Sequence, residues 1–242
     1  MSARTLASVE QPFTRNAEGR EWGIATLLEG DSPRLILAFS GRGVHVLGLP
    51  PFEFLRSLSL VQAKRAFIRD VNRHWYHGGV AGVGDDIDTV AEHLRNLAAE
   101  VEAEQIATIG SSAGGYGALL FGALLSCEVH AFSPQTFIDP ELRARHNDDR
   151  WPESMEELDG HMDMRYADLR PAIAASAATC HVYYPSLRPV DVAHAEHIGD
   201  LPQVTLHAFE SANHNLVGEL RDSGWLDDFM KRLGGDPASP PH

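Results

Sequence analysis

The pentapeptide Gly-Ser-Ser-Ala-Gly at 110–114 has the residue types that a nucleophilic serine requires. Apolar β-forming residues precede it at 106–109, and a helix-forming run follows at 116–121. A serine in this context sits on a sharp strand-to-helix turn with its hydroxyl exposed. The two glycines keep the turn free of Cβ atoms that would collide with the neighbouring strand and helix. The pattern predicts that Ser112 is a nucleophile in acyl-transfer chemistry.

A base and an acid that fit this nucleophile follow later in the chain. A serine hydroxyl is a weak nucleophile until a base takes its proton and an acid orients the base. His214 follows the last predicted strand through a short loop, and is the predicted base. Asp191 follows the penultimate predicted strand and is the predicted acid, with Asp139 as the alternative. The resulting order of serine, acid and histidine is one that such triads are known to adopt.

Acyl transfer also needs two donors for the developing oxyanion. We expect one to be the backbone N–H of Ala113, directly after the nucleophile. The other is expected from the loop at 40–43, which follows an early buried strand. The N–H of Arg42 is the favoured donor there, with Gly41 permitting close approach of the backbone.

Four further residues are candidates for a substrate pocket because they follow predicted strand ends or lie near the predicted acid: Ser40, Trp75, Tyr76 and His194. Core packing is the usual role of such aromatic residues. His194 forms an i, i+3 pair with His197, but neither this pair nor the one at 74 and 77 has a third metal ligand at fitting spacing. The acidic residues at 85–88 fit the start of a helix better than a cation site. No metal and no cofactor are predicted.

The elements that would position these residues alternate between strand and helix. Strands are predicted at 22–28, 34–39, 65–69, 106–109, 127–132, 180–184 and 204–209, and helices at 51–60, 87–98, 116–121, 192–197 and 216–233. Asp85 is the expected N-cap of the second helix, and Asp191 can cap the fourth. This alternation predicts an α/β fold with a mostly parallel central sheet flanked by helices, whose ligands bind at the carboxyl ends of the strands.

Length and composition favour one domain over 1–242, with a lead-in at 1–20, a short acidic lid at 140–170 and a flexible tail at 234–242. The net charge of −14 argues against a nucleic-acid partner, because phosphate contacts need a basic surface. No apolar run reaches membrane-spanning length and no apolar segment follows Met1, so a cytoplasmic protein without a membrane partner is expected. Cys127 and Cys180 are expected in the core rather than in a disulfide. The oligomeric state is left open.

The pentapeptide, the Phe39-Ser40-Gly41 loop and the order of Ser112, Asp191 and His214 resemble the α/β-hydrolase superfamily over most of the chain. Four stretches are similar to a bacterial subgroup of that superfamily: 69–70 with 75–76, 82–88, 131–135 and 191–195. The superfamily resemblance implies a serine hydrolase that cleaves an ester or thioester through an acyl-enzyme. Its substrate would be a small-molecule or carrier-bound acyl group. Ser-Gly in place of the frequent His-Gly, and the short acidic lid, are departures that bear on the substrate class.

Two other functions use the same residues or the same scaffold. The acyl-enzyme could pass its acyl group to an alcohol or amine, which would make the protein an acyltransferase or cyclase. The chain could instead be a non-catalytic accessory or binding protein, since a fold alone does not fix function. Retention of serine, aspartate and histidine favours an enzyme.

Overall fold

A computed structural model describes residues 23–43 and 52–234, and its centre is a seven-stranded sheet with the order β1-β3-β2-β4-β5-β6-β7. β1 pairs with β3 in the antiparallel direction, and every other neighbouring pair is parallel. This is the mostly parallel sheet that the sequence predicts. The strands are β1 (Ile24–Leu27), β2 (Arg34–Phe39), β3 (Lys64–Ile68), β4 (Gln105–Ser111), β5 (Glu128–Phe132), β6 (Thr179–Pro185) and β7 (Val204–Phe209).

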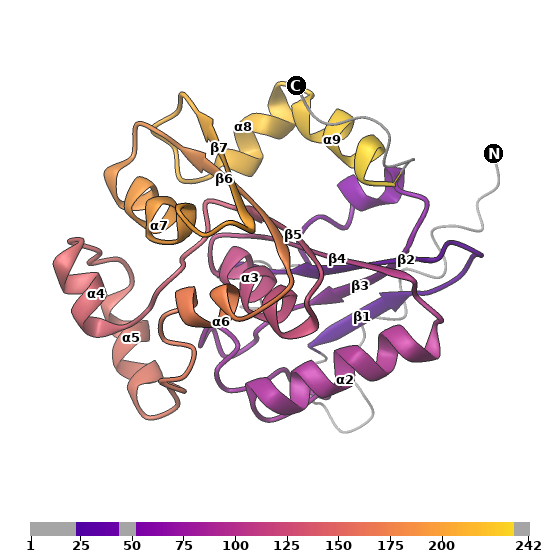
Figure 1. Cartoon of the computed structure of the whole chain (residues 1–242), viewed down its shortest axis with the longest axis horizontal. Helices are drawn as coiled ribbons and strands as arrows, with labels where there is room; N and C mark the ends of the chain where they lie inside the picture. Colours follow the sequence, from indigo (N-terminus) through magenta and orange to yellow (C-terminus); the bar gives the residue numbers. More distant parts are fainter. Residues whose placement is uncertain (1–22, 44–51, 235–242) are drawn as a thin grey trace.

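Helices cover both faces of the sheet (Figure 1). They are η3, a 3₁₀ turn (Ser57–Leu60), α2 (Ile87–Glu100), α3 (Ala113–Leu125), α4 (Pro140–Arg145), α5 (Pro152–Asp159), α6 (Arg170–Ala174), α7 (Pro189–Gly199), α8 (Leu216–Asp222) and α9 (Trp225–Gly234). The buried strand β2 shows why two layers form. Leu35 and Leu37 pack with α2 and α3, whereas Ile36 and Ala38 pack with η3, α8 and α9. Alternate side chains of one strand therefore anchor helices on opposite faces.

Several helix boundaries differ from the sequence prediction. The predicted helix at 51–60 is only the short turn η3 within the described residues. The cap of α2 is Asp86 rather than Asp85, because Thr89 completes a reciprocal capping box with Asp86. The predicted helix at 216–233 is broken into α8 and α9 at Gly224, whose φ of +80° ends one helix before the next begins. α7 starts at Pro189, so Asp191 lies in its first turn and is not its cap.

The predicted lid at 140–170 contains α4 and α5, which lie together beside α7 in Figure 1. Within the described part of the tail, Gly234 ends α9. The predicted lead-in, Trp22 of the first predicted strand and the rest of the predicted tail lie outside the described residues.

Both cysteines are free thiols in the protein interior. Cys180 on β6 is fully buried, and Cys127 is partly buried just before β5. Burial raises the pKa of each thiol to about 12. The thiols are therefore protonated at neutral pH. Cys180 is a core residue, as the sequence predicts, whereas Cys127 is only partly buried.

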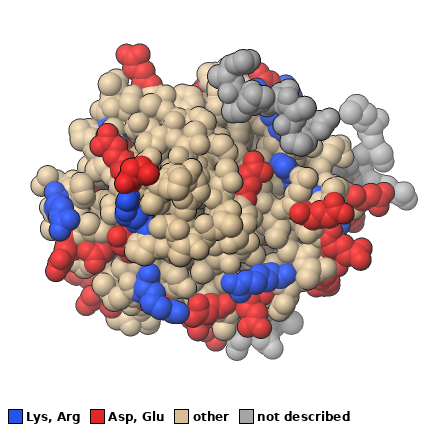
Figure 2. Space-filling view, viewed as in Figure 1, with Lys and Arg blue, Asp and Glu red and all other residues tan. Residues whose placement is uncertain are grey.

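The described residues also give the membrane-spanning potential of the helices and the distribution of surface charge. None of the helices at 23–43 and 52–234 has both the length and the apolar character to cross a membrane. On the face in Figure 2, acidic side chains lie both at the edge and within the face, and the basic side chains form small separate groups rather than one continuous patch.

Candidate active site

The turn between β4 and α3 presents Ser112. Ser112 has a φ of +55°, a left-handed conformation that a non-glycine residue adopts only under local strain. A Cβ on Gly110 would overlap the backbone of Gly114, and a Cβ on Gly114 would overlap the backbone at Phe39 and Ser40. Glycine is therefore required on both sides of the serine, for the steric reason that the sequence suggested.

Ser112, His214 and Asp191 form one hydrogen-bonded chain. The Ser112 Oγ lies 2.9 Å from Nε2 of His214. The Nδ1 atom of His214 lies 2.9 Å and 3.0 Å from the two carboxylate oxygens of Asp191. Because a carboxylate only accepts, Nδ1 carries the imidazole proton and Nε2 accepts from the serine hydroxyl. This tautomer is the one in which a histidine can take a proton from serine.

The three side chains come from three different elements at the same edge of the sheet. Ser112 follows β4, Asp191 lies in the first turn of α7 after β6, and His214 follows β7. The Asp191 side chain is completely buried, and the His214 side chain is 22% exposed. The alternative acid, Asp139, instead caps α4 by accepting from the Leu142 N–H at 2.9 Å.

Two arginines that the sequence analysis did not single out also reach Asp191. Arg150 Nη1 donates to Asp191 Oδ1 at 3.1 Å. Arg188 Nε lies 3.0 Å from Oδ2, but its N–H is not aligned for a hydrogen bond. No local pattern could have identified Arg150, which is 41 residues from its partner along the chain.

His194 lies in the interior behind Asp191, not on the wall of an open pocket as predicted. Its Nδ1 accepts from the Thr136 N–H at 3.1 Å, so its Nε2 carries the proton and donates to Asp148 Oδ2 at 3.0 Å. Burial lowers the pKa of His194 to about 4, which keeps the ring neutral. Although burial alone would raise the pKa of Asp148, hydrogen bonds from Arg150 and His194 hold it well below its usual range.

The loop after β2, at residues 40–43, is held in place by its neighbours. The Gly41 N–H donates to the Glu53 carboxyl group, while the Glu53 N–H donates to Ser40 Oγ at 3.2 Å. Within the described part of the chain, the backbone N–H groups of Arg42 and Ala113 donate no hydrogen bond to another residue. Ala113 begins α3, so its N–H has no acceptor within the helix.

Ser40, Trp75 and Tyr76 are buried supports of this loop rather than pocket-lining residues. The Tyr76 hydroxyl donates to the Ser40 carbonyl at 2.7 Å. The Arg42 guanidinium lies 4.4 Å from the Trp75 ring centre. The prediction that these residues line a substrate pocket is wrong, because all three are buried. Each has its polar group directed at a neighbour within the fold.

The Arg42 side chain reaches away from the loop toward α5. Its guanidinium donates to the Arg73 carbonyl and to the Ser154 hydroxyl. It also lies 5.8 Å from the ring centre of Trp151, and that ring is 6.2 Å from the ring of His214. The stretch just before and within α5 therefore contacts both Arg42 of the 40–43 loop and His214.

A cavity of about 520 Å³ is lined in part by the residues next to Ser112 and His214 in the chain. Its walls include Ser111 and Asn215, which adjoin Ser112 and His214, and Gly43, which follows Arg42. The remaining described lining residues are a mixture of apolar and charged side chains: Phe52, Glu53, Phe54, Leu55, Arg56, Ser57, Val217 and Arg221. This cavity was not predicted from the sequence, because its walls come from segments with no regular pattern.

Comparison with known proteins finds matches among solved structures but not among family models or curated sequences. No protein-family model matches the chain. A search of curated proteins also found no match. The serine hydrolase FphF of Staphylococcus aureus, described as fluorophosphonate-binding, matches at a TM-score of 0.59 with 10% identity, covering 90% of this chain and 94% of FphF. The protein has the α/β-hydrolase fold.

Other solved structures share this α/β-hydrolase fold. A carboxylesterase structure from the thaumarchaeon Nitrososphaera gargenis matches at a TM-score of 0.55 with 15% identity, covering 90% of this chain and 96% of that one. MenH from S. aureus matches at 0.52 with 12% identity, covering 86% and 96%. On this α/β-hydrolase scaffold, the residues at 23–43 and 52–234 contain no group of three or more side chains that could hold a metal ion.

Proposed function

We propose that the protein is a serine hydrolase that cleaves an ester or thioester through an acyl-enzyme on Ser112. The observation that carries this proposal is the unbroken hydrogen-bond chain from Ser112 through His214 to Asp191, with both distances near 2.9 Å. That geometry is the one general-base activation of a serine needs. The α/β-hydrolase fold supports the same reaction, as do the N–H groups of Ala113 and Arg42, which donate to no other residue that the structure describes.

In the proposed mechanism, Ser112 Oγ attacks the acyl carbon while its proton passes to His214 Nε2. Asp191 stabilises the imidazolium and holds the ring in place. The N–H groups of Ala113 and Arg42 donate to the oxygen on which negative charge develops. His214 then protonates the leaving alkoxide or thiolate. Water, activated by the same imidazole, hydrolyses the acyl-enzyme and releases a carboxylic acid.

The cavity beside Ser112 is the proposed binding site for the substrate. Its apolar wall residues Phe52, Phe54 and Val217 suit the carbon chain of an acyl or leaving group. Rates with short and long p-nitrophenyl esters and with acyl thioesters would define the preferred chain length and leaving group. Product analysis in the presence of added alcohol or amine distinguishes hydrolysis from acyl transfer.

The decisive experiment is covalent labelling with a fluorophosphonate probe. The folded protein should be labelled, and Ser112→Ala should abolish the labelling because the probe reacts with an activated serine. Ser223→Ala is the control, since it removes an exposed serine hydroxyl at the end of α8, and should retain labelling. Absence of labelling in the folded wild-type protein, or equal labelling of Ser112→Ala, would contradict the proposal and favour a non-catalytic binding protein.

A further inference from the structure

We propose that Arg150 is a positioning residue for the triad: docked on Asp148, which His194 also binds, it holds the buried carboxylate of Asp191 in line with His214. This inference rests on the proposed function for its consequence in catalysis. Its structural part, the fixing of Asp191, can be measured without any activity.

The first argument is the hydrogen-bonding need of Asp191. Its carboxylate is completely buried, and an ionised carboxylate without partners is costly in the interior. Neutral His214 supplies a single N–H, which leaves most acceptor positions open. Arg150 supplies an aligned donor at 3.1 Å, whereas Arg188 is nearby but not aligned. The Arg150 side chain is 12% exposed and that of Arg188 is 37% exposed, so Arg150 is the more constrained of the two.

The second argument is the way Arg150 is itself held. Asp148 receives two parallel hydrogen bonds from the guanidinium, from Nε at 2.7 Å and from Nη2 at 2.8 Å. Such a fork fixes the plane of the guanidinium as well as its position. The remaining Nη1 then points to Asp191. Lysine cannot reproduce this arrangement, because its ammonium is a point charge without a planar fork.

The third argument is that the segment at 148–150 binds α7 at two positions. Asp191 and His194 are three residues apart on α7 and so lie on the same face of it. Arg150 binds the first and Asp148 binds the second, from a single turn that precedes α5. The carboxylates of Asp148 and Asp191 are compensated by three arginines, because Arg143 lies 4.0 Å from Asp148, Arg150 contacts both aspartates and Arg188 lies beside Asp191. Loss of Arg150 would leave Arg188 as the nearest cation to Asp191, on its Oδ2 side, and the carboxylate would turn away from Arg150's position.

The test compares Arg150→Met with Arg165→Met. Arg165 is a matched control, because it also bridges two aspartates, Asp163 and Asp88, within the same stretch of chain but at the surface. The first readout is the low-field proton resonance of the His214 Nδ1–H held against Asp191, assigned by its loss in Asp191→Asn. Arg150→Met should broaden or abolish this resonance, and Arg165→Met should leave it unchanged. An unchanged resonance in Arg150→Met would overturn the proposal whether or not the protein is an enzyme.

The second readout is the rate of fluorophosphonate labelling of Ser112. Arg150→Met should slow labelling by about 10- to 100-fold, the order of effect expected when a catalytic group is misplaced by about 1 Å. Arg150→Lys keeps the charge and guards against a folding defect, and should recover part of this loss. In an Asp191→Asn background, Arg150→Met should have little further effect, because Arg150 acts through Asp191. An equal loss in that background, or the same loss in Arg165→Met, would show a general structural role instead.

Discussion

Glu53 is the residue whose ionisation has the clearest consequence near the candidate site. Burial raises its pKa to about 7, although the hydrogen bond from the Gly41 N–H and the charge of Arg221 favour the ionised form. The folded protein therefore keeps the Glu53 proton at pH values where the unfolded chain has lost it. The stability that this proton binding contributes is present below about pH 4.5 and is lost as the pH rises through about 7.

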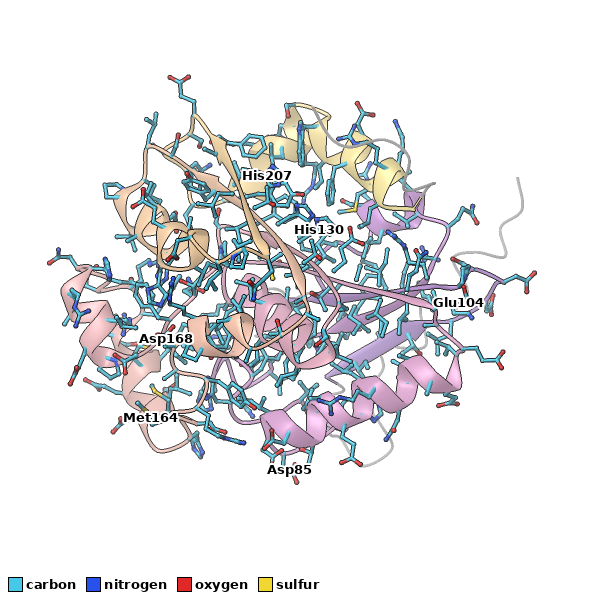
Figure 3. The ribbon with its side chains drawn as sticks, viewed as in Figure 1. Asp85, Glu104, His130, Met164, Asp168 and His207 are labelled. Carbon is cyan, nitrogen blue, oxygen red and sulfur yellow. The ribbon has the colours of Figure 1, made fainter. Side chains whose placement is uncertain are left out.

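Glu53→Gln tests this linkage, because glutamine keeps an acceptor for Gly41 but does not titrate. We compare the unfolding free energy of Glu53→Gln with that of the wild-type protein at each pH. Relative to the wild type, the variant should be more stable at pH 8 than it is at pH 5, by on the order of 2 kcal/mol. Denaturant unfolding of both proteins at the two pH values measures it. Glu104→Gln, at an exposed position labelled in Figure 3, is the control for the loss of a surface carboxylate. A substitution effect that is the same at both pH values would contradict the assigned ionisation of Glu53.

At the same scale, the sequence predicted the residues of the hydrogen-bonded chain but not their supports. Ser112, Asp191 and His214 follow strand ends, and the edge of a parallel sheet brings such residues together. Ser40 and Tyr76 are predicted at a pocket because they follow two other strands, and His194 because it is one helical turn from Asp191. Their burial depends on contacts such as the one between Thr136 and His194, which are 58 residues apart and leave no local pattern.

Among the elements, the break between α8 and α9 provides a test of backbone strain. Gly224 has a φ of +80° and no atom within 4 Å of where a Cβ would stand. Gly224→Ala should therefore destabilise the protein by about 1 kcal/mol through its backbone conformation alone. Gly160 has equally open surroundings but a φ of −72°, so Gly160→Ala should be neutral or stabilise by up to about 0.5 kcal/mol. Thermal unfolding of the two variants measures the difference, and equal effects would contradict this account.

Element prediction from the sequence succeeded where a strand is buried on both faces and failed where one residue decides a boundary. The run at 34–39 is apolar throughout and forms β2 as expected. The apolar pattern at 216–233 is continuous, yet the chain forms two helices because Gly224 adopts a left-handed conformation. The acidic stretch at 140–170 has no clear period, but its turn before α5 supplies Arg150 and Trp151 to the candidate site.

For the whole molecule, buried histidines should make the fold sensitive to acid. Burial lowers the pKa of His77, His181 and His194 to about 4, and nearby histidines contribute for His77 and His181. His181 is stacked against His130 and hydrogen-bonded to His207 on neighbouring strands. Figure 3 labels His130 and His207, and His130 contacts Phe229 of α9. The three rings are thus neutral in the folded protein at pH values where the unfolded chain binds protons.

The sign of this effect is opposite to that of Glu53. Stability due to the three histidines is present above about pH 6.5 and is lost as the pH falls toward 4. Protonation of each histidine should lower the free energy of unfolding by at most about 2 kcal/mol between pH 7 and pH 5. Denaturant unfolding of the wild-type protein should show this fall, and His181→Phe, which keeps a stacked ring but does not titrate, should reduce it. A His181→Phe protein that loses as much stability as the wild type between pH 7 and pH 5 would refute the prediction.

The protonated state of the two native thiols makes the chain a convenient background for site-directed tagging. A thiol with a pKa of about 12 has almost no thiolate at pH 7 to 8, and thiolate is the form that maleimides and iodoacetamides attack. Cys127 and Cys180 are the only cysteines in the sequence, so neither has to be removed first. A cysteine introduced at Met164, which is 62% exposed and labelled in Figure 3, would be the one reactive thiol. A fluorophore or spin label attached there would report from the 140–170 stretch while Ser112 reacts with its own probe.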